Sequence, residues 1–228
     1  DLLESLSYKD LRDMPMEILE DQMAAKSDEL CPRVESEMIL KPFKVFFEKA
    51  FSNDAKKFKE NPALLVNWVR TNIKLNPDKH AMRIPQTPII TRESVVADER
   101  SRNIFFVDVA RSLGIEAQQD GVTGKVQYKK DGQWVDVDFE TTQQQVAKTG
   151  KLVLDYKPTE FLDDPKYYTH FTISKIVNGQ TLLMNFDESA DGSTYGATWA
   201  NAFKDGATLD EGTYLLVTGQ RMADGSVM

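Results

Sequence analysis

The feature that most constrains the fold is an apolar run from about Arg102 to Leu113, which Gly114 ends. Large apolar residues fall on almost every face of the helix that this run predicts, so the helix should be buried on most sides. These residues are Ile104, Phe105, Phe106, Val107, Val109, Ala110 and Leu113. Glycine directly after the last periodic residue is a typical C-terminal stop. We therefore expect a central helix with the rest of its domain packed around it.

The hydrophobic period differs on the two sides of this helix. Before it, apolar residues recur at helical spacing, which predicts a helical stripe from Met16 to Met23 and further helices at 42–51, 53–60 and 63–75. After it, the period is two, and strands at 125–130 and 133–140 flank Asp131-Gly132, a strong hairpin signal. Further strands are expected at 152–156, 168–177, 181–186 and 213–221, with a second hairpin turn at Asn178-Gly179. Helices followed by an antiparallel sheet predict an α+β fold.

Local signals add three expectations to this outline. Asp13 is a candidate N-cap, with Pro15 in the first turn of the helix that follows. Residues 76–97 contain three prolines and little periodicity, so we expect a long loop there. A short helix is expected around 199–203.

Composition excludes several classes of protein. The 228 residues are 41% hydrophobic, which is typical of a globular chain, and the net charge of -8 argues against a nucleic-acid binder because phosphate contacts need a basic face. A single cysteine, Cys31, excludes an internal disulfide and a zinc site built on several cysteines. The two histidines leave few ligands for a transition metal, and we expect no metal and no cofactor. No apolar run approaches the roughly 20 residues of a membrane-spanning helix.

The ends of the chain suggest a piece of a longer protein. The sequence starts at Asp1 without a methionine or a signal sequence and stops inside an expected hairpin. We expect an N-terminal helical region at 1–61, a core at 62–150 and a truncated β-rich extension at 151–228.

A family resemblance emerges between Asp98 and Glu140. The helix-to-strand junction from Val109 to Ala117, the strand from Gly124 to Tyr128 and the segment from Trp134 to Asp138 resemble the transglutaminase-like core of the papain-like cysteine-enzyme fold. The match covers roughly 62–140, and the helix around Trp68 is similar to the one that precedes the family core. The remainder, including 212–224, resembles large multidomain envelope proteins of Bacteroides-type bacteria.

The resemblance implies a catalytic triad that this chain does not contain. Family chemistry needs a cysteine at the start of the buried helix, a histidine on the next strand and an aspartate on the strand after it. The cysteine would fall near Glu99 and the histidine near Val126 or Gln127, and neither residue type is present there. Only the aspartate has an equivalent, at Asp138. Thiol acyl transfer at the family site is therefore not expected.

Other residues carry alternative interpretations. Ser101 or Cys31 could be a displaced nucleophile, although Ser101 or Asp98 also fits a helix cap and a lone cysteine is commonly a small buried residue. Asp138 could instead form a structural ion pair with Arg111 or a lysine.

Binding residues are suggested by the arginines and one tryptophan. Arg100 and Arg102, with Arg92 near in sequence, could bind a carboxylate or a sugar. Trp134 fits the core against the helix, with sugar stacking as the alternative. His80 could line a cleft, and His170 fits a structural position in a strand.

These observations favour a catalytically inactive transglutaminase-like module, a pseudoenzyme, in an exported bacterial protein of the cell envelope. Its partners would be a peptide or a glycan, or the other domains of the same longer chain. The alternative is an active cysteine or serine hydrolase or acyltransferase with a displaced nucleophile.

Overall fold

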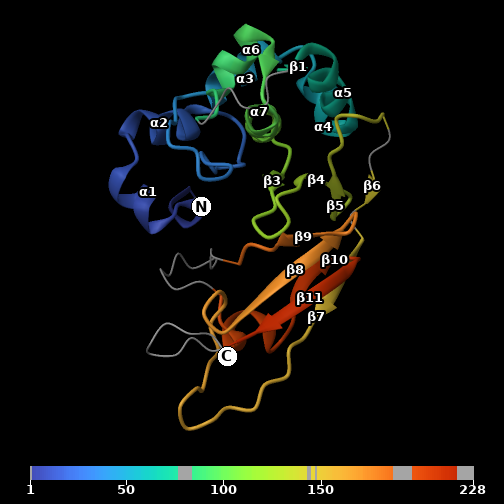
Figure 1. Ribbon diagram of the computed structural model, residues 1–228. Coiled ribbons are helices and arrows are strands. Elements are labelled where there is room, and N and C mark those ends of the chain that lie inside the picture. The colour runs from blue at the N-terminus through green and yellow to red at the C-terminus, as the bar shows by residue number, and fades with distance from the viewer. Residues whose placement is uncertain (1, 77–83, 143–144, 147, 187–196, 220–228) are drawn as a thin grey trace. The chain divides into compact units, whose positions relative to one another are not determined.

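The computed structural model divides the chain into two compact units (Figure 1). The first comprises Asp1–Asp120 and Gly124–Ala147, and the second comprises Gly121–Thr123 and Lys148–Met228. The expected regions 1–61 and 62–150 thus share one unit, apart from 121–123 and 148–150. The structure describes residues 2–76, 84–142, 145–146, 148–186 and 197–219. Helices and small antiparallel sheets make the fold α+β, as the sequence predicted.

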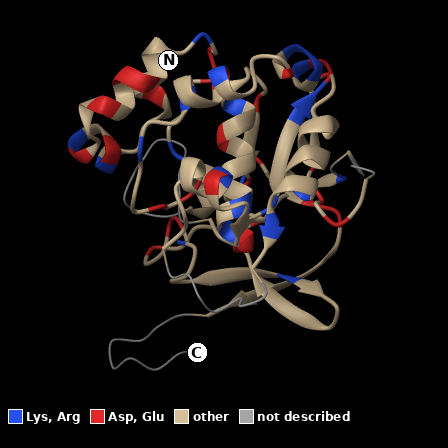
Figure 2. Ribbon diagram, turned by 90° about the horizontal axis from the view of Figure 1, so that it is seen from above, with Lys and Arg blue, Asp and Glu red and all other residues tan. Residues whose placement is uncertain are grey.

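The first unit begins with helices. A 3-10 turn, η1 (Leu2–Ser5), is followed by α1 (Tyr8–Asp13), α2 (Met16–Ala24), α3 (Lys44–Ala50), α4 (Ala55–Glu60), α5 (Ala63–Asn72), α6 (Pro88–Ser94) and α7 (Glu99–Ser112). Basic and acidic residues are interspersed along these helices (Figure 2). No helix among the described residues is both long and apolar enough to cross a membrane.

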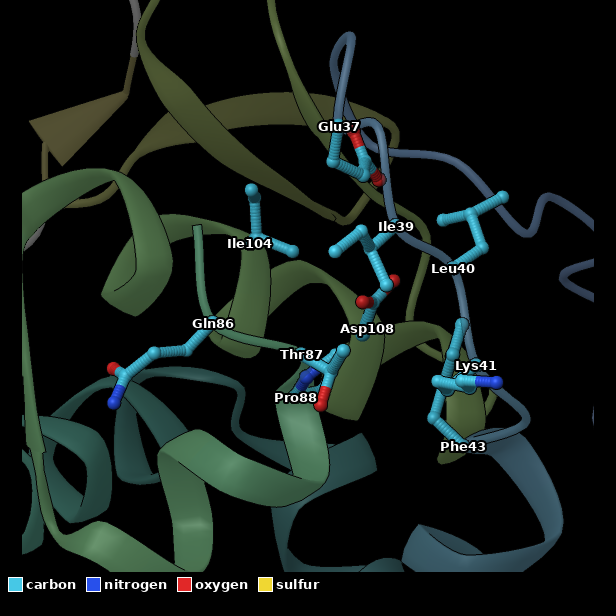
Figure 3. A pocket seen from close by; sticks show the side chains of 10 residues that line it. All are labelled: Glu37, Ile39, Leu40, Lys41, Phe43, Gln86, Thr87, Pro88, Ile104 and Asp108. Atoms are coloured by element: carbon cyan, nitrogen blue, oxygen red, sulfur yellow. The ribbon is translucent and has the colours of Figure 1, made fainter. Parts of the chain in front are cut away.

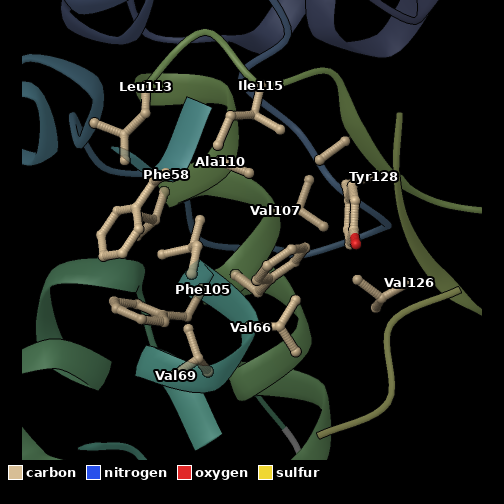
Figure 4. Packing of buried hydrophobic residues seen from close by; sticks show 14 of the residues in the cluster. Phe58, Val66, Val69, Phe105, Val107, Ala110, Leu113, Ile115, Val126 and Tyr128 are labelled. Carbon is tan, nitrogen blue, oxygen red and sulfur yellow. The ribbon is translucent and has the colours of Figure 1, made fainter. Parts of the chain in front are cut away.

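Helix α7 is the central helix that the apolar run predicted. Its N-cap is Asp98, whose side chain accepts a hydrogen bond of 2.6 Å from the backbone N–H of Ser101. Gly114 follows its C-cap with φ +71°, a left-handed conformation that glycine adopts without steric cost. Phe105 and Phe106 are fully buried in a cluster with residues of α3, α5 and the sheet. Figure 4 shows Phe105 in this cluster, with Val66 and Val69 of α5 and with Val126 and Tyr128 of the sheet.

A four-stranded antiparallel sheet packs against α7 in the order β3-β4-β5-β6. Its strands are β3 (Ala117–Gln119), β4 (Val126–Lys130), β5 (Gln133–Asp136) and β6 (Gln145–Val146). Asp131 and Gly132 have φ +52° and +79°, which confirms the predicted hairpin turn between β4 and β5. The helix-facing positions include Val126, Tyr128 and Val135, all members of the core cluster.

Two expectations for the first unit were wrong. Residues 88–94 form α6 instead of a loop, because Pro88 occupies the first helical position, where its missing N–H costs nothing. A short parallel pair, β1 (Lys74–Leu75) with β2 (Val96–Ala97), brackets this segment. Helix α2 is not capped by Asp13: it begins at Met16 and has no side-chain cap hydrogen bond.

The second unit is built from two small antiparallel sheets. One pairs β7 (Thr149–Leu152) with β10 (Ala207–Asp210), and the other has the order β11-β8-β9 from β8 (Phe171–Val177), β9 (Gln180–Leu183) and β11 (Thr213–Thr218). Its core surrounds Tyr167, whose hydroxyl donates to the backbone oxygen of Met184 at 2.7 Å and accepts from the N–H of Ile173 at 3.1 Å. The helix expected at 199–203 is a π-helix, η2 (Trp199–Phe203).

The strand predictions for this unit were correct in kind but displaced in places. Asn178 and Gly179 have φ +51° and +77°, which confirms the second hairpin turn. The strand expected at 152–156 lies earlier, at β7. His170 does not lie in a strand: it precedes β8, and its Nδ1 accepts a hydrogen bond of 3.0 Å from the N–H of Lys166.

Candidate functional site

Ser101, the hydroxyl nearest the expected thiol position, lies buried at the start of α7. Its side chain has no exposed surface, and its Oγ accepts a hydrogen bond of 2.9 Å from the backbone N–H of Gln86. Its own N–H donates to the capping carboxylate of Asp98. Ser101 therefore joins the start of α7 to the segment that leads into α6, which is a structural role.

The strand positions for a base are occupied by residues that cannot act as one at this helix. Successive residues of a strand point to opposite faces, so Val126 and Gln127 lie on different sides of the sheet. Val126 faces α7 and has an apolar side chain. Gln127 faces the other way, and its Nε2 donates to Asp136 Oδ1 at 2.7 Å. Neither residue supplies a proton acceptor to Ser101.

The aspartate opposite Gln127 is Asp136, whereas the resemblance pointed to Asp138. The two-residue turn pairs Gln127 with Asp136 in the hairpin register. Asp136 also accepts a hydrogen bond of 2.6 Å from Lys125 Nζ. Asp138 lies beyond the end of β5, and its Oδ1 accepts from the N–H of Glu140 at 2.7 Å. The helix-facing position next to Val126 is Val137, which packs against the core cluster.

The two arginines considered for ligand binding have acidic partners. Arg100 Nε lies 2.6 Å from Glu35 Oε2. Arg102 is almost fully buried, with its guanidinium 4.6 Å from the centre of the Phe139 ring and one nitrogen 3.3 Å from Glu140 Oε1. Both guanidinium groups thus fix segments of this unit to the first turn of α7.

Trp134 was expected in the core against α7, and this expectation was wrong. It pairs with Lys129 in the hairpin register and lies on the sheet face opposite Tyr128 and Val135. The ammonium of Lys129 lies 5.4 Å from the centre of the Trp134 ring. The half-buried indole therefore forms a cation–π contact.

Cys31 lies at the other end of the central helix. Its Sγ is 3.3 Å from the backbone oxygen of Arg33, and its own carbonyl accepts a hydrogen bond of 3.1 Å from Arg111. Arg111 and Ser101 are about 15 Å apart along α7, at about 1.5 Å of rise per residue. Arg111 also donates hydrogen bonds to the carbonyls of Arg33 and Ala117. The structure therefore does not bring Cys31 together with Ser101, and His80 lies outside the described residues.

A buried carboxyl group in the middle of α7 is the most unusual group of the first unit. Asp108 is 2% exposed, and its Oδ1 has no hydrogen-bond partner among the described residues. Burial, and secondarily the charge of Glu37, raises the pKa of Asp108 well above its usual value, although Arg111 acts in the opposite direction. An Asp108 carboxyl that keeps its proton in this way avoids the cost of burying a charge.

Asp108 lines a cavity of about 10 Å³, enough for one water molecule. Three segments far apart in the sequence form the walls: 37–43, 86–88 and α7. Figure 3 shows Asp108 between Ile39 and Thr87, whereas the side chain of Gln86 extends away from it.

Glu37 is the second acid of the cavity, and its carboxylate accepts hydrogen bonds from backbone N–H groups of its own loop. One carboxylate oxygen accepts from the N–H of Val34 and the other from the N–H of Glu35, both at 2.8 Å. The cavity thus brings the carboxyl group of Glu37, which accepts two backbone hydrogen bonds, near the buried carboxyl group of Asp108.

Sequence reasoning missed both acids of this cavity. Asp108 had a usable signal, because a carboxylate inside a run that is apolar on almost every face must be buried. Glu37 had none, since its position depends on how an irregular segment folds back over α7.

The described residues contain no group of three or more His, Cys, Asp or Glu side chains placed to hold a metal ion. Comparison with protein-family models, with curated proteins and with solved structures found no match to this chain.

Proposed function

We propose that this chain is a catalytically inactive module of the transglutaminase-like kind, with a binding or architectural role in an exported bacterial envelope protein. The observation that carries the proposal is the pair of apolar residues, Val126 and Val137, at the helix-facing strand positions. A nucleophile at the start of α7 needs a base within hydrogen-bond reach, and valine cannot accept a proton.

The first turn of α7 supports the same proposal. Three polar side chains there have structural partners: Asp98 caps the helix, Ser101 accepts from Gln86, and Arg100 pairs with Glu35. Peptide or glycan ligands, or neighbouring domains of a longer chain, are the partners that such a module would have.

An activity assay tests the proposal. Amine incorporation into a glutamine peptide and hydrolysis of a peptide library are measured for the wild-type protein, for Cys31→Ala and for Ser101→Ala. The expected result is the same background rate in all three samples. Turnover that Cys31→Ala or Ser101→Ala abolishes, while circular dichroism shows an unchanged fold, would establish the alternative of a displaced nucleophile.

A further inference from the structure

We propose that Asp108 and its cavity form a proton-binding site that controls how tightly the segment 37–41 closes over α7. The proposal concerns a different place from the start of α7 and a different ligand, the proton. It rests on the enclosed position of one carboxyl group and on the segment that covers it.

The position of Asp108 makes a proton the ligand that fits. The cavity has room for one water-sized species, and Oδ1 lacks a partner among the described residues. An ionised carboxylate there would be a second buried negative charge near Glu37, which its loop already holds as an acceptor. A protonated carboxyl can instead donate to one water in the cavity, which removes the charge and satisfies its donor.

The charged groups around Asp108 are few. Glu37 and Lys41 line the cavity from the covering segment, and Arg111 lies one turn further along α7. Arg33, from the chain before this segment, donates to the backbone oxygen of Glu37 and forms an ion pair with Asp10. Residues 86–88 add no charged side chain from the start of α6. Arg111 donates hydrogen bonds to the backbone carbonyls of Cys31, Arg33 and Ala117, so its guanidinium is directed at these carbonyls.

The covering segment is the part of the wall that can yield. Residues 37–42 form no helix or strand, and Met38 and Ile39 are 83% and 47% exposed. Helix α7 and the start of α6 are instead held by the core and by the Gln86–Ser101 hydrogen bond. When Asp108 loses its proton, hydration of the carboxylate therefore comes most readily from displacement of 37–41.

Hydrogen exchange at the amides of 38–41 tests this proposal. Rates are measured between pH 4 and pH 9 for the wild-type chain and for Asp108→Asn, and their ratio at each pH cancels the intrinsic pH dependence of exchange. Opening linked to loss of one proton should raise this ratio by up to about tenfold per pH unit, between the pKa of Asp108 in the open and in the closed form. Asp131→Asn, which keeps an exposed turn compatible with Asn-Gly, is the matched control and should behave as wild type.

A second variant keeps the test decisive if Asp108→Asn does not fold. Glu37→Gln removes the neighbouring charge and so lowers the pKa of Asp108 in the closed form, and the rise in exchange at 38–41 should level off at lower pH than in the wild type. A ratio that stays constant with pH, or a rise that levels off at the same pH in Glu37→Gln as in the wild type, would overturn the proposal. Exchange that potassium chloride slows and choline chloride does not would also overturn it, because the ligand would then be a metal cation.

Discussion

Gln127 Nε2 donates a 2.7 Å hydrogen bond to Asp136 Oδ1 across the β4–β5 hairpin, on the sheet face opposite the central helix. A histidine at position 127 would therefore gain a carboxylate partner without approaching the start of α7. Such a His–Asp pair would match the orienting half of a catalytic triad in composition but not in position.

The double variant Ser101→Cys with Gln127→His tests this placement. It restores a thiol near the helix start and an imidazole beside Asp136, but alternation along β4 keeps the two groups on different faces of the sheet. We expect no amine incorporation above that of Ser101→Cys alone. Higher amine incorporation in the double variant, lost again when Asp136→Asn is added, would show that the imidazole reaches the thiol despite lying on the other face of the sheet.

Replacement of Phe106 by alanine should destabilise the first unit strongly. The ring is fully buried, and its centre lies 5.7 Å from that of Phe139 and 6.5 Å from that of Tyr128. Loss of such a side chain costs about 3–5 kcal/mol in the free energy of unfolding, measured by denaturant titration. Phe161→Ala, at a ring that is 92% exposed, is the control and should change stability by less than about 0.5 kcal/mol.

Gly132→Ala should cost about 1 kcal/mol of stability through the backbone alone. Its φ is +79°, and a Cβ built there meets nothing within 4 Å, so steric contact makes no contribution. Gly132→Asn should cost less, because asparagine visits the left-handed region more readily. Equal losses for the two variants in chemical denaturation would argue against backbone strain as the cause.

Acid should weaken the first unit through Asp10. Burial alone would raise its pKa, but hydrogen bonds from Arg33 and Ser7 outweigh burial and hold the pKa of Asp10 below its usual value of 3.8. A lowered pKa in the folded state means that the stabilisation is complete above about pH 4 and disappears as the pH falls through the folded-state pKa. Asp10→Asn should therefore flatten the acid limb of a plot of unfolding free energy against pH.

The matched control for this pH effect is Asp13→Asn. The pKa of Asp13 is also lowered, first by its hydrogen bond from Arg12, but the pair is exposed to solvent. Solvent screening makes such pairs weak. The acid limb of Asp13→Asn should therefore follow that of the wild type. An acid limb as flat as that of Asp10→Asn would show that the effect comes from the change in net charge and not from the Asp10–Arg33 contact.

Much of this fold could be predicted from local signals. The apolar run of α7 and the two turns with positive φ are encoded by neighbouring residues, and the structure confirms them. Because a two-residue turn fixes every residue pair of its hairpin, the Asp131-Gly132 turn also determines that Gln127 pairs with Asp136. The resemblance indicated Asp138, whereas the register of the turn places Asp136 opposite Gln127. The same register places Trp134 opposite Lys129, away from the core face of the sheet.

The acids of the cavity lay beyond this kind of reasoning for a physical reason. Glu37 is positioned by the N–H groups of its own irregular loop, and that loop is placed by contacts with residues far away in sequence. Helix α6 was missed because three prolines suggested a loop, whereas one of them begins a helix.

Covalent labelling tests the absence of a catalytic nucleophile most directly. The folded protein is treated with a fluorophosphonate, which labels a serine activated by a base, and with a peptidyl vinyl sulfone, which labels an activated cysteine; adducts are located by peptide mass spectrometry. The account predicts no adduct on Ser101, and no more labelling of Cys31 in the folded protein than in the urea-unfolded protein. Stoichiometric labelling of either residue that requires the folded state would contradict it.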